Sequence, residues 1–211
     1  MPAPARDLWA DWIRLWRSER LRGPAAPCFD ALLARYAEPA RAYHNRTHLA
    51  KMLAHFDTVR AQAQRPEAVE WALWFHDAVY DSRRGDNEAQ SAAWAARELD
   101  AAGAKRDLAA AVVRLILATR HAAEPEEPDA RMLCDLDLSI LGAPPAEFAA
   151  YDRAIRIEYA WVDEAAYRRG RAGVLRAFLQ RRPLFHVPDL RAKLEAQARI
   201  NLQNALQGLE A

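Results

Sequence analysis

The chain has 211 residues, of which 52% are hydrophobic and 28% are charged, the balance of an ordinary globular protein. A chain of this length forms one large domain or two small ones and buries a sizeable core without disulfide or metal staples. Its formal net charge of +1 argues against a nucleic-acid binder that depends on a general positive field. The two cysteines, Cys28 and Cys134, make no disulfide framework and are typical of a reduced protein. No secretory signal and no apolar run near the ~18 residues of a membrane span is visible, so we expect a cytoplasmic protein without a membrane partner.

Helical periodicity dominates the chain. An amphipathic helix is predicted over about residues 6–19, because apolar side chains recur there at spacings of three and four. They are Trp9, Trp12, Ile13 and Trp16. A second helix is predicted to end near Tyr36, and further helices follow at about residues 45–63, 66–80, 87–102, 107–120, 129–141, 145–161, 163–181 and 190–208.

No β-branched alternation is long enough to predict a strand. The prediction is therefore an all-α protein, a single-domain helical bundle over residues 1–211. Segments of a candidate metal site fall between about residues 40 and 140, and the C-terminal helices, about 145–208, are expected to pack on them.

An adjacent pair, His76-Asp77, follows the apolar and aromatic run from Trp71 to Phe75 within the helix predicted over about residues 66–80. An ionised carboxylate after such a run is costly unless it is paired or bound to a metal ion. Neighbouring residues on a helix point about 100° apart, so both side chains reach one ion only if it lies between them, which is possible near a helix end. The alternative is a histidine at a helix C-terminus beside a solvated aspartate, and the local sequence leaves both interpretations open.

Two histidines four residues apart, His44 and His48, stand upstream in the segment Tyr43-His-Asn-Arg-Thr-His48. On the opening turn of a helix they would share one face and could bind one ion together. Alternatively, one binds the ion while the other serves a substrate. Spacing alone makes surface or capping chemistry the commoner explanation for such a pair.

Two aspartates, Asp135 and Asp137, lie in the otherwise apolar segment from Met132 to Leu141, and at least one is expected to face solvent. Histidine and aspartate together offer mixed nitrogen and oxygen donors. Such donors suit a divalent ion such as Mn, Fe, Ni, Co or Zn, with Mg also suitable. We therefore expect one or two divalent metal ions as the cofactor, whereas a structural zinc site would usually use cysteine.

The order His…His-Asp…Asp on an all-helical frame resembles the HD superfamily of metal-dependent phosphohydrolases. This resemblance implies a ligand set that consists of His48, His76, Asp77 and Asp137. It also implies a helical fold of the HD-domain type.

Within that superfamily, the segment Tyr43-His-Asn-Arg-Thr-His48 is similar to the Tyr-His-Asn-x-x-His segment of cyclic nucleotide phosphodiesterases. That similarity implies His44 as the general acid, which protonates a leaving oxygen. The run Leu136-Asp-Leu-Ser139 is similar to the Ala-Asp-Leu-Ser of the same enzymes, which favours Asp137 over Asp135.

The chain departs from both characterised branches after the His-Asp pair. The phosphodiesterases carry more histidine where this chain has Ala78-Val-Tyr-Asp81, so the resemblance does not imply cyclic nucleotide hydrolysis. The alarmone hydrolases have a Glu-Asp pair where this chain has Tyr80 and Asp81. Over nearly its whole length the chain resembles a group of uncharacterised bacterial HD proteins, which share the stretches Asp86-Asn-Glu-Ala-Gln-Ser-Ala92 and Ile155-Arg-Ile-Glu-Tyr159.

Further residues are candidates for catalysis. Asp77 is expected to bind metal and to orient the attacking water, beside His44 as the acid. Glu88, in the first turn of the next helix, is a candidate base or an acceptor for a ligand histidine. The alternative for Glu88 is a charge that the helix dipole favours.

The candidate contacts of a phosphorylated substrate are Asn45, Asp81, His121, Arg156 and Arg171. His121 ends an apolar helix and either contacts phosphate or caps the helix. The forked guanidinium groups of the two arginines suit phosphate, although arginines on helices more often pair with neighbouring acids.

The sequence thus predicts a metal-dependent phosphohydrolase that cleaves a phosphate ester or anhydride of a small molecule, with a nucleotide as one candidate. The alternatives are a non-catalytic, metal-containing nucleotide sensor and a di-iron oxygenase on an HD-type frame. We expect a small phosphorylated partner and no nucleic acid. The aromatic N-terminal helix is compatible with a homodimer face or with a cap on the core.

Overall fold

A computed structural model describes residues 6–210, which form ten α-helices and two 3-10 helices and include no strand. The all-α class predicted from the sequence is confirmed, whereas the HD type stays a prediction. The chain divides into two compact units, Met1–Leu133 and Cys134–Ala211, and each is described by itself. The single-domain organisation therefore also stays a prediction. No helix in the described part of the chain combines the length and apolar character that a membrane crossing requires.

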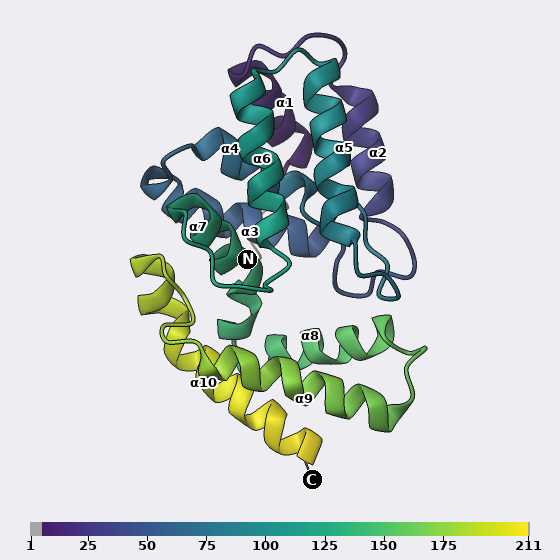
Figure 1. The fold of residues 1–211 in the computed structure, drawn as a ribbon, viewed down its shortest axis with the longest axis vertical. Coiled ribbons are helices and arrows are strands. Elements are labelled where there is room, and N and C mark those ends of the chain that lie inside the picture. Colours follow the sequence, from purple (N-terminus) through teal and green to yellow (C-terminus); the bar gives the residue numbers. More distant parts are fainter. Residues whose placement is uncertain (1–5, 211) are drawn as a thin grey trace. The chain divides into compact units, whose positions relative to one another are not determined.

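The first unit consists of helices joined by loops of different lengths (Figure 1). Its elements are α1 (Leu8–Ser18), α2 (Ala26–Arg35), α3 (Arg46–Val59), η1 (Arg60–Gln62), α4 (Pro66–Phe75), α5 (Asn87–Ala101), α6 (Arg106–Ala118) and the start of α7 (Pro128–Asp137). Helices α5 and α6 run side by side (Figure 1). The predicted and observed helices agree within a few residues at most ends, because each has a clear apolar face and a Pro, Asp or Asn near its start.

Helix α4 is the centre of the first unit, and all its side chains from Ala68 to Phe75 are buried. It packs against α1, α3, α5 and α6. The ring of Trp12 on α1 lies 5.0 Å from Trp71 and 5.2 Å from Trp74, both edge-on. The tryptophan stripe of α1 is therefore core, except for Trp9, which is 42% exposed.

Helix α4 ends at Phe75, so the predicted end near Tyr80 is wrong. His76 is the last residue whose N–H bonds back four residues into the helix, at 2.8 Å. Beyond it, the carbonyl of Asp77 accepts a hydrogen bond of 2.6 Å from the guanidinium of Arg41. A side chain distant in the sequence thus takes a carbonyl that a longer helix would have used.

The second unit contains the end of α7, then η2 (Leu138–Gly142), α8 (Pro145–Glu158), α9 (Glu164–Gln180) and α10 (Pro188–Glu210). Helix α10 packs on η2 and on α9. At Gly142 a Cβ would lie 2.5 Å from Cβ of Leu194 and 2.7 Å from its carbonyl oxygen, so this close approach requires glycine. The buried Asn201 donates to the carbonyls of Leu141 and Ala143, both at 2.8 Å, and fastens α10 to the same turn.

Candidate metal centre

The imidazole of His76 is fixed by the end of α4. Its ring is 1% exposed, and Nδ1 lies 2.9 Å from the carbonyl oxygen of Leu73 one turn earlier. We assign the Nδ1 proton from this contact, since the carbonyl can only accept. Nε2 of His76 therefore carries a lone pair, the arrangement typical of a metal-binding histidine.

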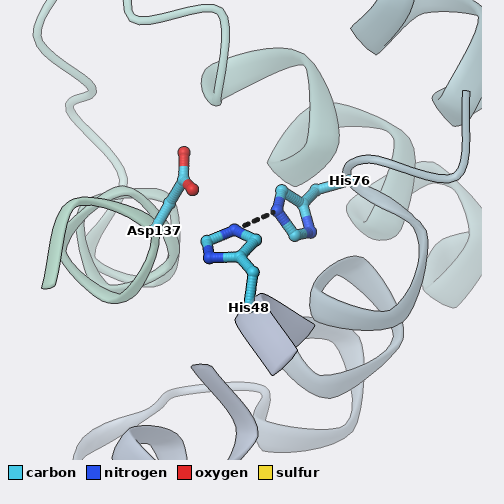
Figure 2. Close-up of side chains that lie close together, drawn as sticks. All are labelled: His48, His76 and Asp137. Atoms are coloured by element: carbon cyan, nitrogen blue, oxygen red, sulfur yellow. Dashed lines mark hydrogen bonds between the residues drawn. The ribbon is translucent and has the colours of Figure 1, made fainter. Parts of the chain in front are cut away.

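The imidazole of His48 approaches His76 from the first turn of α3. Asn45 caps this helix, with its side-chain oxygen accepting from the N–H of Thr47 at 2.9 Å. His48 is buried, and its Nε2 lies 3.3 Å from Nε2 of His76 (Figure 2). Two ring nitrogens, from residues 28 positions apart, thus meet inside the first unit.

The carboxylate of Asp77 lies beside this pair. Its Oδ2 atom is 3.0 Å from Nε2 of His76 and 3.7 Å from Nε2 of His48. Because α4 has ended, the backbone turns after His76. The side chains of His76 and Asp77 can therefore point toward the same position, with Nε2 and Oδ2 close together. The sequence predicted this convergence for the case of a nearby helix end.

Asp137 is the last residue of α7, a continuous helix that begins in the first unit. His48, His76 and Asp137 each offer one ligand atom, and these atoms all lie within 4.8 Å of one another (Figure 2). Both histidines are buried and the aspartate is half-buried. The group could hold a metal ion, as the sequence predicted, and its geometry does not select a particular metal.

The spacing of these atoms fits a shared ion. Two ligands that each lie about 2.1 Å from one metal are about 3.0 to 3.4 Å apart when they are neighbours in an octahedral or tetrahedral shell. Two of the three distances lie in this range, since the two Nε2 atoms are 3.3 Å apart and Oδ2 of Asp77 is 3.0 Å from Nε2 of His76, whereas its 3.7 Å to Nε2 of His48 is slightly longer. Imidazole and carboxylate donors suit a divalent transition ion.

Asp135 has a different task from Asp137. Its carboxylate is 1% exposed and accepts from the backbone N–H groups of His186 and Val187, both at 2.6 Å. These groups directly precede α10, so Asp135 fixes the segment from which that helix begins. Burial raises the pKa of Asp135, while the two N–H bonds act against that rise.

His44 precedes the cap of α3 and is not part of the helix. The possibility that His44 and His48 share one helix face is therefore excluded. Their rings are nevertheless neighbours, with centroids 5.9 Å apart and at 75°. The half-buried His44 ring also stacks on Tyr80, at 4.0 Å between centroids and 26° between planes. The predicted general acid therefore stands beside the candidate ligands.

Sequence reasoning missed Arg41, which is 4% exposed. Its guanidinium donates to the carbonyls of Asp77 at 2.6 Å, Ala78 at 3.2 Å and His44 at 3.5 Å. It shapes both segments that carry candidate site residues. An arginine three residues before His44 gives no signal of this role, because the carbonyls of Asp77 and Ala78 that it binds lie far along the chain.

Three other predicted residues of the first unit have local structural tasks. Asn45 donates to the carbonyl of Ala42 at 2.9 Å besides capping α3. Asp81, which is exposed, accepts from the N–H of Arg83 at 2.9 Å in the loop before α5. Glu88 lies half-buried in the first turn of α5.

His121 follows the end of α6 with a φ of 52°, in the left-handed region. Its N–H bonds to the carbonyl of Ala118 at 3.2 Å, so its backbone closes the helix end. Roles of Asn45, Asp81, Glu88 and His121 toward a substrate stay predictions.

Both predicted arginines of the second unit have acidic neighbours, the alternative that the sequence left open. Arg171 is buried and binds Asp152 through two nitrogens, at 2.8 and 3.1 Å. Arg156 binds Glu164 at 3.0 Å, and its guanidinium lies 4.6 Å from the ring centre of Tyr167. Contact of either arginine with substrate stays a prediction.

Comparisons of this chain with protein-family models, with curated proteins and with solved structures found no match.

Proposed function

We propose that this protein is a metal-dependent phosphohydrolase that cleaves a phosphate ester or anhydride of a small molecule. The observation that supports the proposal most strongly is the convergence of the His48 and His76 Nε2 atoms with the Asp77 carboxylate, at 3.0 to 3.7 Å. The half-buried imidazole of His44 beside these donors supplies a group suited to proton transfer.

The proposed ligands are His48, His76, Asp77 and Asp137. A divalent ion in such a set would acidify a water molecule and draw electron density from a phosphoryl oxygen. The chain's own residues supply the rest. The Leu73 carbonyl keeps the His76 tautomer correct for binding.

Asp77, besides binding the ion, and His44 would act directly on the reacting groups. Asp77 would orient the attacking water with its carboxylate, and His44 would give its ring proton to the leaving oxygen. A nucleotide is one candidate substrate, because it carries the required phosphate group.

Metal content tests the ligand set directly. Wild-type protein, His48→Ala, Asp77→Ala and His44→Ala would be purified in parallel and analysed for bound transition metals. We expect bound metal in the wild type and in His44→Ala, and a clear loss in the other two. Equal metal in the wild type and in Asp77→Ala would refute the site.

Turnover tests the activity. A panel of nucleotides and phosphate esters would be run with Mn²⁺, Mg²⁺, Ni²⁺ and Co²⁺. His44→Ala should lose about 10²-fold or more in kcat and retain metal, the usual contribution of a general acid. Saturable nucleotide binding without any turnover would instead favour a metal-containing sensor.

A further inference from the structure

The segment that carries His44 and the segment that carries Asp77 are joined by one buried side chain. Arg41 donates to the carbonyl of His44 and also to the carbonyls of Asp77 and Ala78. An arginine fork makes several hydrogen bonds in a fixed plane, so it sets the spacing of the backbones that it bridges. The proposed acid and the proposed ligand are thereby tied together within the first unit.

An aromatic ring completes this connection. Tyr80 lies three residues after Asp77 and stacks on His44, with 4.0 Å between the ring centroids. The Arg41 guanidinium lies 5.8 Å from the centre of the same Tyr80 ring. The His44 imidazole is therefore restrained through its backbone carbonyl and through its ring face.

We propose that Arg41 and Tyr80 position His44 as a fixed proton donor, and that this donor selects phosphate esters of alcohols over phosphoanhydrides. The proposal rests on the proposed phosphohydrolase function. It goes further by naming a substrate class and two positioning residues that the sequence did not single out for this task.

The reason lies in the leaving group. In the hydrolysis of an alkyl phosphate, the oxygen of water forms a bond to phosphorus while the bond from phosphorus to the ester oxygen breaks. The bonding electron pair stays on the ester oxygen, which takes the His44 proton and leaves as the alcohol. The attacking water loses one proton to solvent, and His44 regains one from solvent.

An alkoxide is about as basic as hydroxide, whose conjugate acid water has a pKa of 15.7, so its departure needs a proton. The phosphate that leaves a phosphoanhydride is far less basic, since its second pKa is about 6. A restrained acid therefore accelerates the first reaction much more than the second. It also accelerates the first more than the hydrolysis of 4-nitrophenyl phosphate, whose leaving group departs without a proton.

The test compares an alkyl phosphate, 4-nitrophenyl phosphate and pyrophosphate on the Mn²⁺-loaded protein. Wild type should turn over the alkyl ester faster than pyrophosphate. In Tyr80→Leu, kcat on the alkyl ester should fall about tenfold or more, below the full contribution of the acid. Turnover of 4-nitrophenyl phosphate and bound metal should stay near wild type, and Tyr80→Phe, which keeps the ring, should resemble wild type.

Two further variants separate positioning from general damage. Tyr80→Leu added to His44→Ala should cause no further loss on the alkyl ester, because both changes remove the same proton transfer. Arg41→Gln should show the same preferential loss on the alkyl ester as Tyr80→Leu. Equal losses on the alkyl and nitrophenyl esters, or faster turnover of pyrophosphate by wild type, would overturn the proposal.

Positioning also has a readout that needs no turnover. The carbon-bound ring protons of His44, assigned with His44→Gln, should change their NMR shifts in metal-free Tyr80→Leu, because the stacked ring current is lost. Unchanged shifts would overturn the positioning even in an active enzyme. A changed shift with no hydrolysis of any substrate by wild type would refute the phosphohydrolase function and the substrate class, and would leave only the stacking.

Discussion

Two buried polar clusters of the first unit differ in the kinds of side chain that they bring together. At Glu70, on α4, a carboxylate that is 1% exposed binds the guanidinium groups of Arg14 and Arg60. At His48, His76 and Asp77, two imidazoles and a carboxylate converge within 3.0 to 3.7 Å. The first cluster joins opposite charges, whereas the second joins side chains of the types that serve as metal ligands.

This difference separates structural polar groups from candidate functional ones. The Glu70 cluster ties α4 to α1 and η1, and both guanidinium groups also reach solvent. Buried ligand atoms that face one another stabilise the fold less than the Glu70 ion pairs do. A loss of folding stability of this kind is common at functional sites.

Removing Glu70 should destabilise the fold and spare the candidate metal centre. We expect Glu70→Ala to lower the free energy of unfolding by about 3 kcal/mol, at the low end for a broken buried ion pair because both arginines can be hydrated. Urea denaturation would measure the loss. Glu67→Ala, which removes a more exposed partner of Arg60 at 3.2 Å, is the matched control and should cost about 1 kcal/mol or less. If Glu70→Ala also lost bound metal, the two clusters would not be independent.

The second cluster should behave in the opposite way. Added divalent metal at about 100 times its Kd should raise the unfolding free energy of the wild type by about 2.7 kcal/mol, and that of His48→Ala by much less. With a chelator present, we expect the two proteins to differ little in stability. Thermal unfolding with and without Mn²⁺ measures both quantities, and a large loss of stability in chelated His48→Ala would mark the histidines as structural.

The contrast also explains what could be predicted from the sequence. Helices follow from local periodicity, so most helix positions were correct. The end of α4 was not, because the side chain that takes the carbonyl of Asp77 belongs to Arg41, 36 positions earlier. Local patterns carry no information about such a partner.

Prediction of the candidate site from local sequence patterns has the same limit. The candidate ligand types and their order are visible in the sequence, and His48, His76 and Asp77 lie close together in the structure, while their role as ligands stays a prediction. The family resemblance favoured Asp137 over Asp135 as a ligand, but the apolar pattern that both share could not predict what Asp135 contacts. Asp135 meets the N–H groups directly before α10, which lie about 50 positions away along the chain.

Asp129 is a buried carboxylate with both oxygens hydrogen-bonded, and its removal should cost less stability than the removal of Glu70. It is 8% exposed, and its two oxygens accept from the N–H groups of Gln64 and Arg65, both at 2.8 Å, at the start of α4. Asp129→Ala should cost about 1 to 2 kcal/mol, within the usual range for buried N–H groups that lose their hydrogen-bond partner. The control is Asp107→Ala, whose carboxylate is 69% exposed and pairs with Arg65, and which should cost less than about 1 kcal/mol. Metal content should be unchanged in both variants.

The smallest predicted effect is a pH dependence in the second unit, where Glu195 of α10 is another carboxylate that the fold itself satisfies. Partial burial opposes its ionisation, but the N–H groups of Leu184 and Phe185 and the guanidinium of Arg199 outweigh that cost and lower the pKa of Glu195. Since the pKa in the folded state is below that in the unfolded chain, the ionised carboxylate stabilises the fold above the unfolded value of about 4.3. This contribution is lost as the pH falls through the lower folded value.

Glu195→Gln removes the titration. The stability difference between the wild type and Glu195→Gln should therefore be constant at neutral pH and should shrink as the pH falls below about 4.3, by less than about 1 kcal/mol because the group is partly solvated. Urea denaturation of both proteins between about pH 3 and pH 7 measures this difference. A difference that stays constant over the whole range would show that the pKa of Glu195 is the same in the folded and unfolded states, and would contradict the prediction.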